Sequence, residues 1–204
     1  MSGLTHKQKD ELRYAQRLFD RLAIEPTDVE PADRPDIRFS FEGKRIGLEV
    51  TLGDSEEYLR VQSMKMSGEI TGVTHPVGLH DDRKERRSKQ EVQTEALTPK
   101  WEDASILDKR WAEKVKGAYE TKLGKLNHPD FARFNEDWLL ITGFEGPAND
   151  VVSLRESPKH LAAELSSVHP VDNGFDRVYI HFDDYLFSYI NGELAVSNRV
   201  EEGT

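Results

Sequence analysis

The most regular pattern of apolar and polar positions lies between residues 36 and 51. Large apolar residues alternate with polar ones over 37–41 and, after a turn at 42–45, alternate again over 46–50. A period of two is typical of β-strands with one buried face. Pro35 breaks any helix and favours an extended entry into the first strand. The pattern predicts a β-hairpin.

Apolar residues at helical spacing predict a first helix over residues 5–23 and a long helix over 103–126. Residues 24–34, with prolines and several acids, are expected to form a loop. Further along the chain we predict a short helix over 55–66, a strand over 138–142, a helix that begins at Ser157-Pro158, a strand over 177–182, and a hairpin over 185–196 that turns at Asn191-Gly192.

This order of elements predicts the fold class. Helix, paired strands, helix, strand, helix, strand and hairpin are typical of an α/β domain with a mixed central sheet flanked by helices. A length of 204 residues suits a single domain over 1–204. Residues 52–104 show no clear pattern and are expected to form an irregular insertion in that domain.

The amino-acid composition excludes several kinds of site and partner. The formal net charge of −10 argues against a general nucleic-acid coat, although it leaves room for a local basic groove. The absence of cysteine excludes disulfides, thiolate metal sites and cysteine nucleophiles. The sequence contains no apolar run long enough to span a membrane, and its charged N-terminus lacks a signal peptide's apolar core. We therefore expect a cytoplasmic protein without a membrane partner.

Two carboxylates stand at unusual places in the predicted hairpin. Asp36 begins the first strand and Glu49 lies near the end of the second, although acids are poor strand residues. A divalent cation such as Mg²⁺ would explain both, because it prefers hard oxygen ligands. The alternative is that both are ordinary surface acids on a solvated face, paired with Arg38 or Lys44.

Two charged residues, Glu11 and Lys122, also stand at unusual places, on the apolar faces of predicted helices. Glu11 shares a helical face with Ala15 and Leu18, and Lys122 lies on the apolar stripe of the long helix. Charged groups at such positions are costly unless they are paired. The alternatives are a Glu near a helix start that reaches solvent and a lysine whose stem covers apolar surface while its ammonium group reaches water.

Taken together, Pro35-Asp36, the hairpin and Leu48-Glu49-Val50-Thr51 resemble the core of the PD-(D/E)XK nuclease superfamily, the restriction-endonuclease-like fold. The chain departs from the usual motif at Thr51, where most members have lysine. Some branches have this Glu-x-Thr form and supply the lysine from a neighbouring helix, as Lys122 would. The resemblance covers roughly residues 7–51 and 103–182.

The resemblance implies a restriction-endonuclease-like core and a nuclease that depends on Mg²⁺ or Mn²⁺. It implies that Asp36 and Glu49 hold the metal, that Glu11 is an outer or second-metal ligand, and that Thr51 and Lys122 complete the catalytic set. It also implies a nucleic-acid substrate, DNA more than RNA. Many members act as dimers, which makes a homodimer part of the expectation.

A second hypothesis is a catalytically inactive module of the same fold that binds protein or nucleic acid, for example an acidic inhibitor of a DNA-binding protein. The acidic net charge and the missing motif lysine favour it. A basic cluster over 80–89 is read either as a phosphate-binding arm or as a solvated helix or loop.

Overall fold

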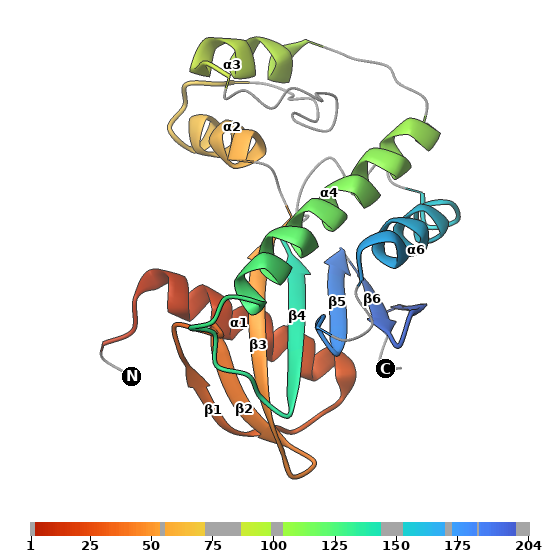
Figure 1. Cartoon of the computed structure of the whole chain (residues 1–204). Helices are drawn as coiled ribbons and strands as arrows, with labels where there is room; N and C mark the ends of the chain where they lie inside the picture. Colours follow the sequence, from red (N-terminus) through yellow and green to blue (C-terminus); the bar gives the residue numbers. More distant parts are fainter. Residues whose placement is uncertain are drawn as a thin grey trace, which may run out of the picture.

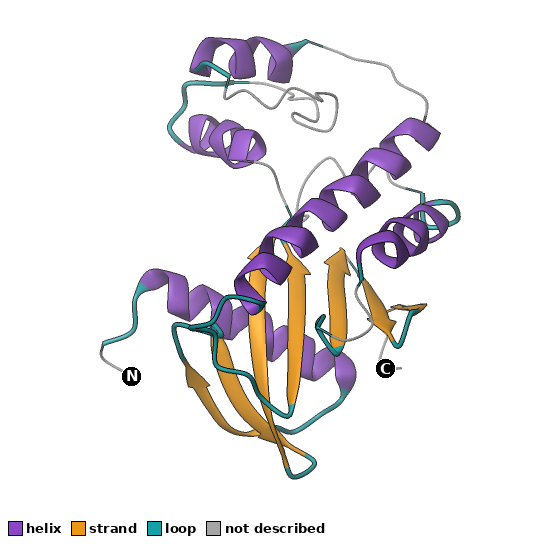
Figure 2. Ribbon diagram, viewed as in Figure 1, coloured by secondary structure: helices purple, strands orange, loops and turns teal. Residues whose placement is uncertain are grey.

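A computed structural model of the chain describes residues 3–53, 56–71, 87–98, 104–143, 153–169, 173–182 and 184–198. In these ranges one seven-stranded sheet forms the centre of the molecule, and helices cover both of its faces (Figures 1 and 2). The strands are β1 (Thr27–Pro31), β2 (Ile37–Phe41), β3 (Lys44–Leu52), β4 (Glu136–Thr142), β5 (Arg177–Phe182), β6 (Tyr185–Ile190) and β7 (Glu193–Asn198). The helices are α1 (His6–Leu22), α2 (Glu56–Met66), α3 (Lys89–Leu97), α4 (Ala104–Leu126) and α6 (Ser157–Val168).

The strands lie in the sheet in the order in which they occur in the chain. The three central strands β3, β4 and β5 are parallel to one another, and the pairs on either side are antiparallel. β4 is buried on both faces, as its continuous apolar run predicts. The prediction of an α/β fold with a mixed sheet flanked by helices is confirmed.

Helix α1 covers one face of the sheet. It starts at a capping box in which Thr5 and Gln8 exchange hydrogen bonds, and it ends at Ala23 in the left-handed region. Its apolar stripe packs on β2, β3 and β4, where the buried residues are Ala15, Leu18, Phe19, Ile37, Phe39, Ile46, Leu48, Val50, Trp138 and Leu140. The inward side chains of the predicted hairpin therefore face α1.

Helices α4 and α6 cover the opposite face. Trp111, Val115 and Tyr119 of α4 pack with Leu161 and Leu165 of α6 over strands β4 to β6. Because neighbouring residues of a strand point to opposite faces, the positions between the α1-facing residues of β3 point toward α4. Glu49 is one of these positions.

Helices α2 and α3 lie beside each other, away from the sheet (Figure 1). They share a small apolar cluster of Val61, Met64, Ile70, Val92 and Ala96. The helix expected over 55–66 is confirmed, whereas α3 was not predicted. The interval 52–104 is therefore more helical than expected in its described parts.

The basic cluster predicted over 80–89 lies outside the described residues from 80 to 86. Its last part agrees in part with the alternative of a solvated helix, because Ser88 and Lys89 are exposed and Lys89 begins α3. Arg87 is buried and paired with Glu95, and Ser88 caps α3 through a capping box with Glu91. Both residues hold α3 in place.

The prediction of a loop over residues 24–34 is wrong in part, because residues 27–31 form the edge strand β1. β1 pairs with β2 through Glu30 opposite Arg38 and Pro31 opposite Ile37, and a bulge follows Thr27. Proline is tolerated on an edge strand because the missing N–H faces away from the ladder. With four of its five residues exposed, β1 carries little of the alternation that marks a strand.

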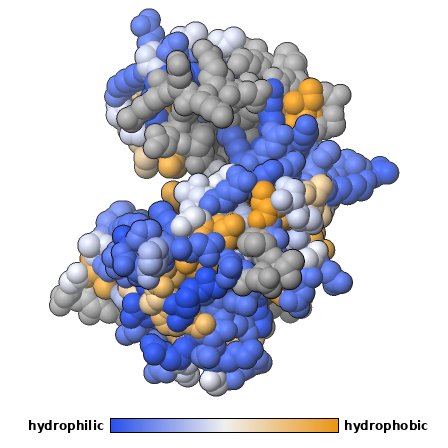
Figure 3. Space-filling view, viewed as in Figure 1, coloured by the Kyte–Doolittle hydropathy of each residue, from blue (hydrophilic) through white to orange (hydrophobic). Residues whose placement is uncertain are grey.

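The exposed surface agrees with the charged composition. The side of the molecule drawn in Figure 3 is mainly hydrophilic, and hydrophobic residues reach it only in small patches. Over the ranges that the structure describes, none of the helices is both long and apolar enough to cross a membrane.

Gly47 marks a close contact between the hairpin and the chain that enters β4. A Cβ at this position would lie 2.8 Å from Phe134 Cδ2, 2.8 Å from Pro35 Cγ and 3.2 Å from Asp137 Oδ1. Gly47→Ala should therefore lower the free energy of unfolding by about 1–3 kcal/mol, measured by urea denaturation.

Gly117→Ala on α4 is the control: its Cβ would meet nothing within 4 Å. We expect it to gain up to about 1 kcal/mol. Equal stability of Gly47→Ala and wild type would contradict the close packing.

Candidate functional site

The hairpin register brings Asp36 and Glu49 together. Ile37 pairs with Leu48, and one further step of the same antiparallel register sets Asp36 opposite Glu49. The backbone N–H of Val50 donates a 2.9 Å hydrogen bond to Asp36 Oδ2 and fixes that carboxylate. Each residue is only 4% exposed. The interpretation of these acids as solvated surface residues is therefore wrong.

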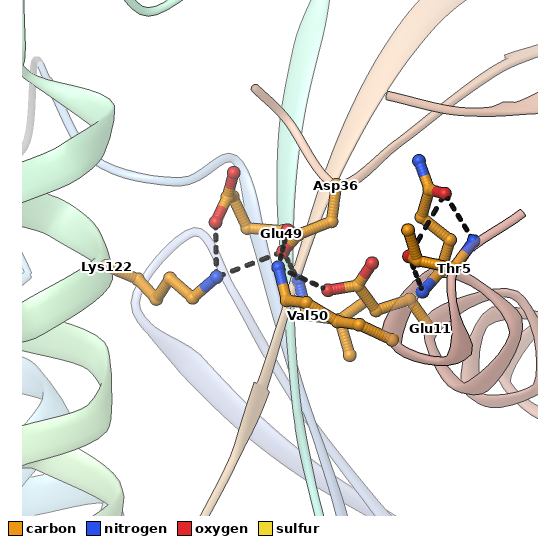
Figure 4. A network of polar contacts seen from close by, with 8 residues as sticks. Thr5, Glu11, Asp36, Glu49, Val50 and Lys122 are labelled. Atoms are coloured by element: carbon orange, nitrogen blue, oxygen red, sulfur yellow. Dashed lines mark hydrogen bonds and ion pairs between the residues drawn. The ribbon is translucent and has the colours of Figure 1, made fainter. Parts of the chain in front are cut away.

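Lys122 reaches this pair from α4. Its Nζ donates a 3.0 Å hydrogen bond to Asp36 Oδ2 and a second, short one to Glu49 Oε2 (Figure 4). The residue is 7% exposed, so its ammonium group does not extend into solvent. The apolar stripe of α4 positions the lysine, and the two carboxylates hold its charge.

Glu11 and Lys7 join the cluster from α1. Lys7 Nζ lies 3.0 Å from Glu11 Oε1 and 3.4 Å from Asp36 Oδ1. Glu11 is 6% exposed, whereas the side chain of its partner Lys7 is 76% exposed, so Lys7 reaches the carboxylate from the surface of the protein. Asp36 thus links the two lysines, with one oxygen toward Lys7 and the other toward Lys122. Sequence reasoning missed Lys7, and its only signal is the spacing of four residues from Glu11 on one helix face.

Thr51 is the one predicted site residue that remains outside the network. It follows Glu49 by two residues on β3 and points to the same face, where it is partly exposed and pairs with Ile141 of β4. None of the hydrogen bonds that connect Glu11, Asp36, Glu49 and Lys122 involves its hydroxyl. The carboxyl ends of β3 and β4 meet here, at the edge where open α/β sheets bind ligands.

The charges of the cluster do not balance. Three carboxylates, Glu11, Asp36 and Glu49, share two ammonium groups, Lys7 and Lys122. Burial raises the pKa of Glu49 above its ordinary value, with Lys122 acting against it and the Asp36 charge adding to it. Burial likewise raises the pKa of Glu11, partly offset by Lys7. A further cation would relieve both shifts.

The pKa of Asp36 moves in the opposite direction. Burial alone would raise it, but the nearby Lys122 ammonium, the Val50 N–H and Lys7 together hold the pKa of Asp36 below its ordinary value. Asp36 is therefore the member of the cluster that stays ionised most readily.

Asp137 lies further along the same face, opposite Gly47 on the neighbouring strand. It is 2% exposed, and its Oδ1 has no hydrogen-bond partner within the described ranges. Burial raises the pKa of Asp137 to about 6, even though Arg133 Nε lies 2.8 Å from its Oδ2.

This raised pKa predicts a pH dependence of stability. The folded state binds more protons than the unfolded state between about pH 4 and 6, so the stability contributed by Asp137 is lost as the pH rises through that window. Asp137→Asn removes this titration. Its unfolding free energy relative to wild type should increase by about 1–3 kcal/mol between acidic and neutral pH. Urea titrations at both pH values measure the change, and the exposed Asp130→Asn is the control. A pH-independent difference for Asp137→Asn would contradict the assignment.

The cluster fits a divalent cation by the chemistry of its donors. Mg²⁺ takes one or two protein carboxylates and completes its shell with water and phosphate oxygens. Asp36 and Glu49 supply two such carboxylates side by side, and Glu11 supplies a third nearby. Over the described part of the chain, no group of three or more acidic or imidazole side chains is arranged closely enough to hold a metal ion by itself. A metal here would therefore depend on substrate oxygens and water as well as protein ligands.

Comparisons of the chain with protein-family models, with curated proteins and with solved structures find no match. The chemistry of the site is therefore inferred from its own residues and their geometry.

Proposed function

We propose that this protein is a metal-dependent nuclease of the restriction-endonuclease-like type, which hydrolyses phosphodiester bonds in DNA or RNA, with DNA as the preferred substrate. The observation that carries the proposal is the buried cluster between α4 and the hairpin of β2 and β3. It joins Asp36, Glu49 and Lys122, which lie as much as 86 residues apart in the chain, and its carboxylates outnumber its ammonium groups.

Asp36 and Glu49 would hold Mg²⁺ or Mn²⁺, with Glu11 as an outer ligand. The bound cation supplies Lewis-acid activation of the phosphate and of water. The Val50 N–H and the low pKa of Asp36 keep that carboxylate oriented and charged for this role. Because burial raises the pKa of Glu49, cation binding there would favour its ionised form and should release protons.

Lys122 would act directly on the reacting groups. Its ammonium group is held against both carboxylates. A phosphate bound to a metal at these carboxylates would lie near it, and the ammonium group would then offset the negative charge that builds up on the phosphate oxygens as water attacks. A fixed, partly desolvated cation stabilises that charge more than water does. The bond from phosphorus to the attacking water oxygen forms as the bond to the bridging oxygen breaks; the water gives a proton to solvent, and the departing oxygen takes one from solvent. The Thr51 hydroxyl, partly exposed beside the cluster, would position the water or a phosphate oxygen.

The proposal is tested by incubating the protein with end-labelled single-stranded DNA, duplex DNA and RNA of one sequence. Each is combined with Mg²⁺, with Mn²⁺, or with a chelator. We expect cleavage with metal and none with the chelator, with a DNA substrate cut faster than the RNA. Intact substrates in every metal condition would contradict the proposal.

A second candidate function is a non-catalytic module that binds nucleic acid or protein. One observation favours it: Lys122 already bridges Asp36 and Glu49, as in a purely structural ion-pair cluster. Such a protein would show no metal binding that depends on these acids.

A further inference from the structure

Two arginines flank an aromatic ring beside the candidate site. Arg38 Cζ lies 5.7 Å from the centre of the Phe134 ring, and Arg45 Cζ lies 5.6 Å from it. We call these three residues the arginine patch. Phe134 comes from the segment between α4 and β4, whereas the arginines come from β2 and β3. The patch therefore depends on the tertiary fold.

The arginine patch lies on the same face of the sheet as the candidate site. Arg38 pairs with Gly47 and Ser40 pairs with Arg45, so both arginines share the face of Asp36 and Glu49. Positions two residues apart on a strand are separated by roughly 7 Å. Arg38 is therefore one such step from Asp36.

The charges of the patch are not used within the fold. Neither guanidinium has a carboxylate partner in the part of the chain that the structure describes, and Arg38 Nε is buried there without a hydrogen-bond acceptor. Neighbouring cations behave differently. Lys44 is paired with Glu136, and Arg133 is paired with Asp137. Two arginines left without acids in a protein of net charge −10 indicate an external anion.

We propose that Arg38 and Arg45, supported by Phe134, bind phosphate groups of the nucleic-acid backbone that adjoin the phosphate at Asp36 and Glu49. This inference rests on the proposed function and names the residues that hold its substrate. Guanidinium groups suit this role because they bind phosphate in a bidentate manner and stack on aromatic rings. The acidic remainder of the surface repels a polyanion, so the patch also orients it toward the site.

The test is direct binding, measured without cleavage. Fluorescence anisotropy follows short labelled single-stranded and duplex DNA with Ca²⁺ in place of Mg²⁺, over a range of salt concentrations. Arg38→Ala/Arg45→Ala should weaken binding of the better-bound probe by at least about tenfold. The slope of log K against log salt concentration should become shallower by about 1.8 for duplex DNA or about 1.4 for single-stranded DNA, at about 0.9 or 0.7 per phosphate contact. Arg38→Lys/Arg45→Lys should restore the slope because it restores the charge.

The matched control removes the same charge elsewhere. Arg13 and Arg155 have side chains that are 57% and 90% exposed, and Arg13 lies on α1, across the sheet from the patch. Arg13→Ala/Arg155→Ala should bind with nearly wild-type affinity. Urea denaturation of each variant separates lost binding from lost folding, and Arg38→Gln/Arg45→Gln provides a second variant that keeps the bulk around Phe134.

The outcomes separate this inference from the proposed function. Wild-type affinity and slope in the Ala and Gln variants would overturn the arginine patch even if the protein cleaves DNA. Absence of binding by the wild-type protein would overturn it as well. Weakened binding in both variants, in a protein that cleaves nothing, would support the patch and contradict the nuclease.

Discussion

Asp36→Asn/Glu49→Gln should abolish the rise in melting temperature that Mg²⁺ or Mn²⁺ gives to the wild-type protein. A ligand that binds only the folded state stabilises it by mass action, by about 1.4 kcal/mol at ten times its Kd. For a chain of this size that corresponds to about 3–6 °C. The amides keep the shape of the carboxylates and remove their charge, so the metal loses its ligands. Differential scanning fluorimetry with and without metal measures the shift.

The metal-dependent shift is the relevant quantity, because the variant also changes stability in the absence of metal. It relieves repulsion between acids and leaves Lys122 with fewer partners. Asp130→Asn/Glu113→Gln is the matched control, since it neutralises two exposed acids whose ion-pair partners, His128 and Lys109, lie outside the cluster. The control should keep the wild-type shift. An undiminished shift in Asp36→Asn/Glu49→Gln would place the metal elsewhere or show that its binding is non-specific.

Lys122→Met should destabilise the protein by about 3–5 kcal/mol at neutral pH, because it leaves two buried carboxylates without their shared cation. We expect removal of the ammonium group to raise the folded-state pKa of both acids, because burial raises each pKa and Lys122 is the main group that opposes it. The loss should therefore be small at acidic pH, where both acids are protonated, and grow as the pH rises toward neutrality. Urea denaturation at the two pH values measures it.

Lys109→Met on the same helix is the control, because Lys109 is exposed and its partner Glu113 remains solvated. It should change stability by less than about 1 kcal/mol. A loss that is equally small in Lys122→Met, or one that does not depend on pH, would mean that Lys122 does not neutralise the two carboxylates.

Much of the fold could be predicted because its elements carry strong local signals. The alternation over β2 and β3 predicts the hairpin, and the Asn191-Gly192 turn, with positive φ at both residues, joins β6 and β7 as expected. Glu11 and Lys122 could be singled out because a charged residue on an apolar stripe must find a partner. The sequence does not show which partner, and the structure brings both into one cluster with Asp36.

The features that could not be predicted depend on contacts between distant segments or lack a local pattern. β1 is an exposed edge strand with few apolar residues. In the sequence Lys7 cannot be told from an ordinary surface lysine, because its contact with Asp36 forms only when α1 packs beside that residue. The arginine patch forms only when the segment before β4 brings Phe134 to the hairpin. By contrast, α3 had a readable signal, the capping box between Ser88 and Glu91.

The assignment of the cluster as an active site is tested by comparing the single-turnover cleavage rates of the wild-type protein and Glu49→Gln, with saturating protein and Mg²⁺ or Mn²⁺. We expect metal-dependent cleavage by the wild type and a loss of at least about 10²–10³-fold in the variant, the range seen when one stabilising group of an active site is removed. If unfolding curves show that the variant is folded, the loss of cleavage is a loss of catalysis and not of structure. Cleavage by Glu49→Gln at the wild-type rate would contradict the assignment of this cluster as the active site.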